Sequence, residues 1–522
     1  MRAALWLAAS LGAGRAGAQT AKPAAPIIDT IVVVNHNIFD ENQELQLGFM
    51  ARFADAIHIR TRTSVIRRSL LLNQGDPYDS ARVVESERAL RALNVFRQVE
   101  IDTERLGDRL ALRVETADGW STKPQFNWAS SGGDVSWVVG MIEDNLIGTA
   151  TALTALYSKT PDRSAWSFLY QNPHFLWRRP RLAALYQDLS DGRSGSWTLS
   201  LPFYETAAQR AIGTSGEATT ARVLEFRDGQ FQDSTERHAL RFSVGGGFAL
   251  HATSHGYLRL WGAAAWRRED FVPESTTVVP YSTFGTVGAG FEIGSSRFVI
   301  LEHFNTFARR EDEDLSQTLR FGLWAAPRAW GYGPGQAGIG AELSGQTSIS
   351  WPFGFIVIRG QSNGVYTGSG FDSTRVTGAV TLGSQNFARQ SIVIHYEGGE
   401  LRNPKPGAQF DTWAYDNGPR LFPAHAFTGT RMAWFAVEDR ILVNEEVMDL
   451  LGVGLAPFYD WGGAWYSNEP SRTGGDVGLA LRLGPTRAVE GSVEEIDFGW
   501  RFGAGFEGSG PWALTIREAI FF

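Results

Sequence analysis

The stretch GVGLAPFYDWG, from Gly452 to Gly462, alternates between two kinds of residue. In an extended chain, successive side chains point to opposite faces. One face would carry Val453, Leu455, Pro457, Tyr459 and Trp461, and the other Gly454, Ala456, Phe458 and Asp460. The stretches DVGLALRLG (476–484) and EIDFGWRFG (495–503) repeat the pattern. One face of each predicted strand is uniformly apolar, whereas the other mixes glycine with charged residues.

Two architectures fit such strands. In a soluble sandwich the apolar face would meet a second sheet. In a membrane barrel it would meet lipid, and the charged face would line a wet lumen. The chain's 18 Trp, 33 Phe and 13 Tyr fit the aromatic girdles of a barrel. The last residues, WALTIREAIFF, also place apolar side chains on one face, ending at Phe522. These features favour the barrel.

The N-terminus has the pattern of a secretory signal peptide. Arg2 precedes a short apolar stretch, and Ala16-Gly17-Ala18 provides a small-residue cleavage site. We therefore predict a signal peptide over residues 1–18 and a linker over 19–27.

Residues 28–118 have a different texture, that of a small α+β domain. A β-branched run at 31–34 is followed by helical spacing after Thr63, with Gly75 as the predicted stop. A second helix is predicted to begin near Asp79, with Val83, Ser86 and Leu90 on one face. Two alternating segments follow, so the predicted order is β-α-α-β-β. Residues 39–60 carry no pattern that assigns them to a helix or a strand.

The predicted fold is therefore mainly β, with a C-terminal transmembrane antiparallel β-barrel over 119–522 after the small domain. At roughly 25 residues per strand and connection, the barrel would have about 16 strands. The chain has no cysteine, which excludes disulfides and cysteine-ligated metal sites. A net charge of -8 argues against a nucleic-acid partner.

Several motifs together resemble the BamA/TamA superfamily, also called the bacterial surface antigen family. The segment 64–101, SVIRRSLLLNQGDPYDSARVVESERALRALNVFRQVEI, resembles a POTRA domain. EDNLIG (143–148) and YQNPHFLWRRPRLAALYQ (170–187) resemble early barrel strands of that family. FYDWGGAW (458–465), DVGLALRLGPT (476–486) and IDFGWRF (496–502) resemble its last strands. The resemblance covers about Ile28 to Phe522, and it implies a single POTRA domain and a barrel.

The resemblance also implies a functional loop inside the lumen. The family's loop arginine motif corresponds to Pro419-Arg420-Leu421-Phe422, followed by Pro423. Its Phe-x-Asp-x-Gly strand motif corresponds to Phe458, Asp460 and Gly462. Asp460 is the expected partner of Arg420, Asp476 and Asp497 are secondary candidates, and Phe522 would be the insertion signal. Leu421 stands where the family has glycine, which predicts a different backbone shape. From spacing alone, Arg420 would be a solvated loop residue.

By this resemblance, the chain is expected in the bacterial outer membrane, with its N-terminal domain in the periplasm. The implied function is insertion of outer-membrane proteins or translocation of polypeptides, by β-augmentation at the POTRA edge and barrel seam. Implied partners are outer-membrane lipids, unfolded polypeptide or barrel clients, and periplasmic or lipoprotein assembly factors. No catalytic residue, metal or cofactor is expected. A passive pore and a lipid-handling protein are the alternatives.

Two polar motifs contain residue types that can bind metal ions. His251 and His255 share a face of a predicted strand, but no third ligand accompanies them. The run Glu311 to Asp314 lacks the ordered ligand spacing of a calcium loop. We interpret the histidines as a lumen or loop pair and the acidic run as a solvated loop.

Overall fold

The computed structural model describes residues 25–38, 58–106, 109–131, 134–177, 179–273, 282–307, 311–331, 337–367, 370–412, 418–447, 451–486 and 493–519. The predicted signal peptide, most of the linker, residues 39–57 and Phe522 lie outside these ranges. Among the described helices, none has the length and apolar character needed to cross a bilayer.

The N-terminal domain is a three-stranded sheet with two helices. Its elements are β1 (Ile28–His36), α3 (Thr63–Ser69), α4 (Ser80–Arg91), β2 (Phe96–Leu106) and β3 (Arg109–Asp118). The sheet order is β1-β3-β2, with β1 parallel and β2 antiparallel to β3. Central β3 buries Leu112 and Val114 against Ile66 and Leu90 of the helices. Alternation in the strand and helical spacing in α4 therefore meet in one core.

The first helix is shorter than its apolar pattern predicts. Helix α3 ends at Ser69, and Leu70 is already extended, with ψ of 140°. Leu70 and Leu72 still reach the core from this extended chain. The backbone N–H of Leu71 donates to the Ser86 hydroxyl, which replaces a helical hydrogen bond. Gly75, with φ of 92°, therefore serves a turn rather than the end of the helix.

The second helix begins where the sequence predicts. The Asp79 side chain accepts hydrogen bonds from the backbone N–H groups of Ala81 and Arg82, at 2.9 and 3.4 Å. Such an N-cap satisfies donors that have no partner in the first helical turn.

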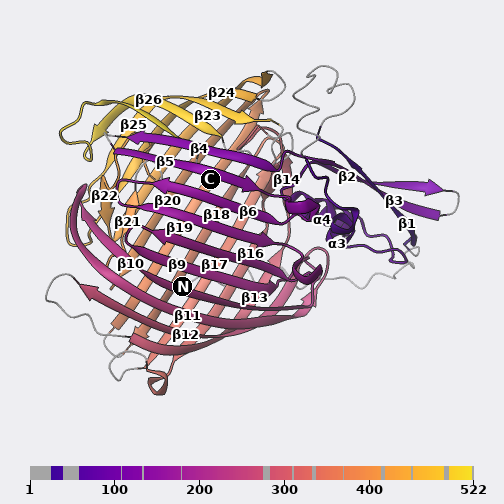
Figure 1. Cartoon of the computed structure of the whole chain (residues 1–522), viewed down its shortest axis with the longest axis horizontal. Coiled ribbons are helices and arrows are strands. Elements are labelled where there is room, and N and C mark those ends of the chain that lie inside the picture. Colours follow the sequence, from indigo (N-terminus) through magenta and orange to yellow (C-terminus); the bar gives the residue numbers. More distant parts are fainter. Residues whose placement is uncertain are drawn as a thin grey trace.

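The rest of the chain forms a closed antiparallel barrel (Figure 1). Its first ten strands are β4 (Thr122–Ser131), β5 (Asp134–Glu143), β6 (Ala152–Lys159), β7 (Ser164–Asn172), β8 (Arg181–Leu189), β9 (Gly192–Leu201), β10 (Arg210–Arg227), β11 (Gln230–Ala252), β12 (Tyr257–Pro273) and β13 (Ser282–Ser295). The others are β16 (Gln317–Ala326), β17 (Gly338–Trp351), β18 (Gly354–Thr367), β19 (Gly370–Phe387), β20 (Gln390–Arg402), β23 (Arg431–Val447), β24 (Leu451–Trp465), β25 (Gly474–Pro485), β26 (Glu494–Gly503) and β27 (Trp512–Glu518). Short 3-10 turns follow at η1 (Leu146–Gly148), η2 (Phe175–Trp177) and η3 (Arg328–Trp330).

The barrel has 20 strands in the described part of the chain, so the estimate of about 16 was wrong. The estimate assumed longer connections than the structure has. Only two residues separate β8 from β9, β10 from β11, and β17 from β18. A new strand therefore begins about every 20 residues rather than every 25. Barrels of 16 and of 20 strands both lie within the known range.

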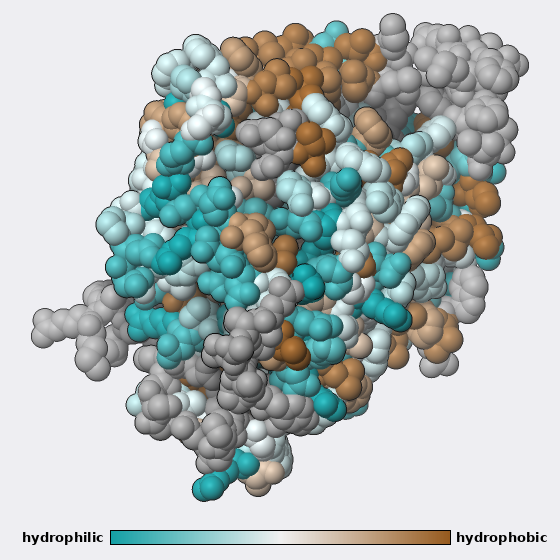
Figure 2. All heavy atoms as spheres, turned by 60° about the vertical axis from the view of Figure 1, so that its left-hand side comes forward, coloured by the Kyte–Doolittle hydropathy of each residue, from teal (hydrophilic) through white to brown (hydrophobic). Residues whose placement is uncertain are grey.

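The two faces of the barrel wall are as the alternation predicts. Val477, Leu479, Phe498 and Trp500 point outward and are exposed, whereas Asp476 and its neighbours on the other face are buried. Figure 2 shows hydrophilic residues over the end of the barrel away from the N-terminal domain. It shows hydrophobic residues along the upper flank, where Figure 1 places β23 to β26. A charged interior inside an apolar wall excludes the sandwich.

Two insertions enter this barrel from opposite ends. We call the end beside the N-terminal domain the near end, and the other the far end (Figure 1). The inner loop joins β20 to β23 at the far end and contains β21 (Phe410–Thr412) and β22 (Phe427–Gly429). The near-end hairpin joins β13 to β16 and contains β14 (Phe298–Leu301) and β15 (Glu311–Asp314). Both carry charged or aromatic residues into the lumen.

Candidate functional site

The inner loop makes a tight turn at the predicted arginine motif. The backbone N–H of Phe422 donates to the Pro419 carbonyl at 3.4 Å, with Arg420 and Leu421 between them. Among the described residues with positive φ, the inner loop contributes Asn403, Gly407 and His425, but not Leu421. The turn therefore does not need the glycine that Leu421 replaces.

Arg420 is buried, with 2% of its surface exposed, so it is not a solvated loop residue. Its Nε and Nη2 donate to the two carboxylate oxygens of Asp460 on β24, at 2.6 and 3.2 Å. This is the two-pronged geometry that a planar guanidinium makes with a carboxylate. The guanidinium also lies 4.1 Å from the centre of the Phe458 ring. The predicted partner and the predicted strand phenylalanine are therefore both in contact with Arg420.

A second carboxylate binds the backbone of the same turn. Asp476 on β25 accepts a hydrogen bond from the Leu421 N–H at 2.9 Å. Arg501 on β26 donates to the Leu421 carbonyl at 3.3 Å. Asp476 lies directly across from Asp460 in the strand pairing, and across from Arg501 on its other side. The lumen wall therefore holds both the side chain and the backbone of the loop.

Asp497 has a different partner from the one we predicted. Its carboxylate accepts from Nε of Arg517 on β27 at 2.8 Å, whereas Asp460 takes the bidentate bond of Arg420. Arg517 also donates to Glu495 at 2.5 Å. Asp497 thus contributes to the electrostatic field around Arg420 without a direct hydrogen bond to it.

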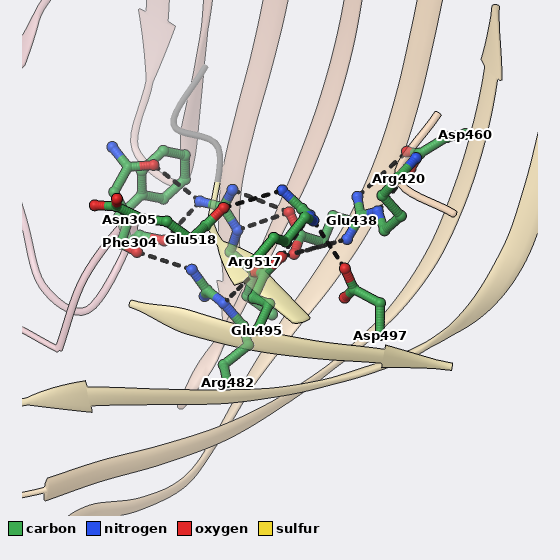
Figure 3. A network of polar contacts seen from close by, with 11 residues as sticks. Phe304, Asn305, Arg420, Glu438, Asp460, Arg482, Glu495, Asp497, Arg517 and Glu518 are labelled. Carbon is green, nitrogen blue, oxygen red and sulfur yellow. Dashed lines mark hydrogen bonds and ion pairs between the residues drawn. The ribbon is translucent and has the colours of Figure 1, made fainter. Parts of the chain in front are cut away.

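The charged cluster contains more residues than the sequence analysis predicted (Figure 3). Arg420 Nη1 lies 3.7 Å from both Glu438 of β23 and Glu495 of β26. Glu438 accepts from Arg440, and Glu495 accepts from Arg482. The cluster comprises Arg420, Arg440, Arg482, Arg501, Arg517, Glu438, Asp460, Asp476, Glu495 and Asp497.

These five arginines and five carboxylates balance in charge, and each is at most 4% exposed. Buried ions are tolerated when they are paired and hydrogen-bonded. The sequence analysis did not single out the other members of the cluster, although the alternation of the strands marks their positions. Arg482 and Arg501 lie on the same alternating faces as Asp476 and Asp497, and Glu438 and Arg440 alternate along AWFAVEDRIL.

The remaining predicted residues serve the packing of the loop. Phe422 is fully buried and contacts Phe427 and Phe506, with ring centres 5.1 and 5.9 Å apart. Pro423 accepts a hydrogen bond at its carbonyl from the Ala426 N–H, at 3.4 Å. At Gly462 a Cβ would lie 2.5 Å from the Ala433 carbonyl oxygen, so a larger residue would push β23 and β24 apart. Phe522 lies outside the described residues.

On both sides of the arginine motif, the inner loop is attached to other parts of the barrel. His425 contacts Asp162 of the β6–β7 turn at 3.0 Å and Asp411 of β21 at 2.5 Å. Its ring stacks on Phe226 with centres 3.5 Å apart. Burial disfavours the charged imidazole, but hydrogen bonds to the two aspartates outweigh it and raise the pKa of His425 to about 9. Lys405 forms an ion pair with Glu269 of β12.

The contacts of this site attach the inner loop to the lumen wall. Each carboxylate of the cluster binds an arginine or a backbone N–H, and the described residues include no group of three or more ligands placed for a metal ion. The acidic run 311–314 is not the solvated loop we expected. It forms β15, where Asp312 binds Arg91 of α4 and Glu311 binds the hairpin's own backbone.

Comparison with known proteins finds one similar sequence and several similar folds. No family model matches the chain. It is 29% identical over 161 residues to the outer membrane protein assembly factor BamA of Neorickettsia risticii (strain Illinois). That stretch covers 27% of this chain and about a fifth of the relative, 21%. Over that stretch, this chain is therefore similar to an outer-membrane assembly factor, and it spans well under two thirds of that relative's length.

Among solved structures, this chain is similar to CdiB from Acinetobacter baumannii, with a TM-score of 0.47 and 9% identity. That alignment covers 94% of this chain and 73% of the other. BamA from Haemophilus ducreyi lacking POTRA domains 1-3 aligns with a TM-score of 0.39 and 11% identity, over 93% and 84% of the two chains.

Proposed function

We propose that this protein inserts proteins into the outer membrane or translocates polypeptides across it. The observation that carries the proposal is the inner loop held in the lumen by Arg420 and Asp460. The strands that hold it, β23 to β27, run up to the line where the last strand meets the first. The loop is therefore placed to set the shape of that part of the wall.

The line between β27 and β4, which we call the seam, is the proposed site of action. β27 has seven described residues, the fewest of any described barrel strand, whereas β10 and β11 pair over 18 positions. A short strand contributes few hydrogen bonds, and it is the easiest to separate. Once separated, its backbone groups would lack partners in lipid, where each unsatisfied group costs several kcal/mol. A client strand would relieve that cost by pairing with the open edge.

The N-terminal domain offers a second place for an extended client. Among the described strands, the sheet order places β1 and β2 at its two edges, with only local hydrogen bonds on their outer sides, such as those of Ile28 with the 75–76 turn and of Ile101 with Glu87. Edge strands bind extended peptides through main-chain hydrogen bonds. We place this domain in the periplasm, where unfolded barrel clients, lipids of the inner leaflet and lipoprotein assembly factors would be its partners. The name of the BamA relative, an assembly factor, supports this choice of clients.

The passive-pore alternative is disfavoured by what occupies the lumen. The inner loop reaches from β20 to β12, where Lys405 pairs with Glu269, and to the β6–β7 turn, where His425 contacts Asp162, and the near-end hairpin enters from the other end. A pore would not require ten charged residues arranged around one loop. Lipid handling remains the alternative in which the same seam opens to a lipid rather than to a strand. Absence of an enzymatic activity stays a prediction.

The test is reconstitution with and without the loop contact. The full chain in vesicles would receive a urea-unfolded barrel client ending in phenylalanine, and folding would be followed by heat-modifiable migration on gels. We expect faster client folding with the wild type than with empty vesicles, and loss of the gain in Arg420→Ala. Arg431→Ala is the matched control, because Arg431 is an exposed arginine at the start of β23. Equal rates in all vesicles, with steady solute flux through the wild type, would replace the proposal by a pore.

A further inference from the structure

One face of α4 is attached to the near end of the barrel. Arg91 makes a two-pronged bond with Asp312 of the near-end hairpin, at 2.6 and 2.8 Å. One turn earlier, the Arg88 guanidinium lies 3.8 Å from the centre of the Phe298 ring in the same hairpin. Glu85 accepts from the backbone and hydroxyl of Thr206, both at 2.8 Å. The hairpin is therefore the barrel segment that holds the C-terminal end of α4, whereas residues 145–148, 174–179 and 205–206 hold other parts of the N-terminal domain.

The hairpin is braced so that it can transmit a displacement. The Glu311 carboxylate accepts hydrogen bonds from the backbone N–H groups of Phe304, Asn305 and Thr306, at 2.9, 2.9 and 3.1 Å. These bonds tie the segment beyond β14 to the start of β15. Because Asp312 is the next residue, the contact to α4 and the brace share one short strand.

The other side of the hairpin contacts the charged cluster under the seam (Figure 3). Arg440 donates to the Phe304 carbonyl and to the Asn305 side chain, both at 2.9 Å. Arg482 donates to the Asn305 carbonyl at 2.8 Å. These two arginines also bind Glu438 and Glu495, the carboxylates nearest Arg420 Nη1. The hairpin is thus connected to the loop arginine through two residues, one arginine and one carboxylate.

Phe307 completes the attachment by filling a notch made by glycines. A Cβ at Gly452 or Gly484 would lie 2.3 or 2.7 Å from the Phe307 ring, so the ring fits only because these positions have no side chain. Phe307 is 6% exposed and packs with Val493 and Ala519. Ala519 is the residue directly after β27, the seam strand. The hairpin therefore contacts both the N-terminal domain and the end of the seam.

We propose that the near-end hairpin mechanically links the N-terminal domain to the seam. Movement of α4 away from the barrel withdraws Phe307 from the glycine notch and frees the end of β27. If the seam acts as proposed above, a client that pulls on the N-terminal domain would loosen the seam before reaching it. The link itself is a property of the unliganded chain and can be tested without any client.

The test uses two reporters in the whole 522-residue chain, which contains no cysteine. The first is the rate of maleimide modification of Ala519→Cys, a position that is 7% exposed. We expect Arg91→Ala to raise that rate about tenfold, the effect of losing roughly one charge-assisted bond. Asp312→Asn, which removes the other half of the pair, should act alike. Arg113→Ala, which breaks an exposed ion pair with Glu115 in the same domain, is the control.

The second reporter measures the link in the opposite direction, since coupling between two sites is reciprocal. Spin labels at the exposed positions Val84 of α4 and Phe353 of the near-end β17–β18 turn report their separation. Phe307→Ala should lengthen and broaden that distance, whereas Phe387→Ala, an exposed near-end phenylalanine, should not.

Heat-modifiable migration shows that each variant is folded. The proposal is overturned if Arg91→Ala and Asp312→Asn leave the Ala519→Cys rate within about twofold of the control. It is equally overturned if Phe307→Ala leaves the distance unchanged. Either result would leave the client-folding test of the proposed function standing, because neither reporter involves a client.

Discussion

Replacing Arg420 by alanine should release the inner loop while leaving the barrel closed. Arg420 is 2% exposed and Asp460 is 1% exposed, so the variant leaves a buried carboxylate without its bidentate partner. Asp476 lies directly across from Asp460, which adds like-charge repulsion once the guanidinium is gone. Breaking a buried ion pair by removing one partner costs about 3–5 kcal/mol. We expect the free energy for loop opening to fall by that amount.

Hydrogen exchange measured by mass spectrometry reports this free energy directly, because amides exchange from the opened state. In the wild type the Leu421 amide is bonded to Asp476 and should be protected. In Arg420→Ala, peptides covering 418–430 should exchange at least about 100-fold faster, the equivalent of about 3 kcal/mol. Peptides from β24 should keep their protection, since the ladder around them is intact.

The control is Arg431→Ala, which removes an exposed arginine paired to Glu400 at 3.5 Å. Exposed pairs contribute about 0–1 kcal/mol, so loop exchange should change less than about fivefold. A double variant with Asp460→Ala should cost less than the sum of the two single changes, with a coupling of about 2 kcal/mol. If Arg420→Ala exchanged like Arg431→Ala, the buried pair would not be what holds the loop.

Three further changes test separate parts of the structure. Gly462→Ala should lower the stability of the folded barrel by about 1–3 kcal/mol in urea titration, because its Cβ would overlap the neighbouring strand, whereas Gly510→Ala, with open space around it, should stay within about 0.5 kcal/mol. The contacts of His425 with Asp162 and Asp411 should be fully stabilising below about pH 6.5 and weaken as pH rises through about 9, because the folded-state pKa of His425 is raised. A spin label on the inner loop should gain mobility above pH 9, and His425→Gln should show no such step. A disulfide between Leu514 and a scanned position on β4 should abolish client folding, whereas one between Leu514 and Phe498, its partner on β26, should not; equal activity of both would argue against an opening seam.

The parts of the site that sequence reasoning located are those carried by local pattern. Alternation points Asp460 and Asp476 to the charged face, and both contact the turn that contains Arg420. The same alternation marks Asp497, but it cannot say which arginine a carboxylate will bind. That choice depends on the curvature of the wall and on where the loop enters, and the structure gives Asp497 to Arg517.

The acidic run 311–314 is a second case in which the sequence could not identify the partners of charged residues. Four consecutive charges are typical of a solvated loop, yet Glu311 and Asp312 are held by the hairpin backbone and by Arg91. The sequence separation between Arg91 and Asp312 is 221 residues, and no periodicity connects them. Helical spacing in α4 identified the face carrying Val83 and Leu90, but the second face, which docks on the barrel, consists of charges that would suit water equally well.

What the sequence alone determined is each strand's two faces, the small domain's element order and the residue types that line the lumen, because these depend on the two-residue period of an extended chain and on local capping. Only the tertiary structure decided the 20-strand closure, the partner of each buried charge and the meeting of the near-end hairpin with the end of β27. Those features depend on which distant segments become neighbours when the sheet closes. Closure is set by the summed register of all the strands, and no single stretch of the chain contains that sum.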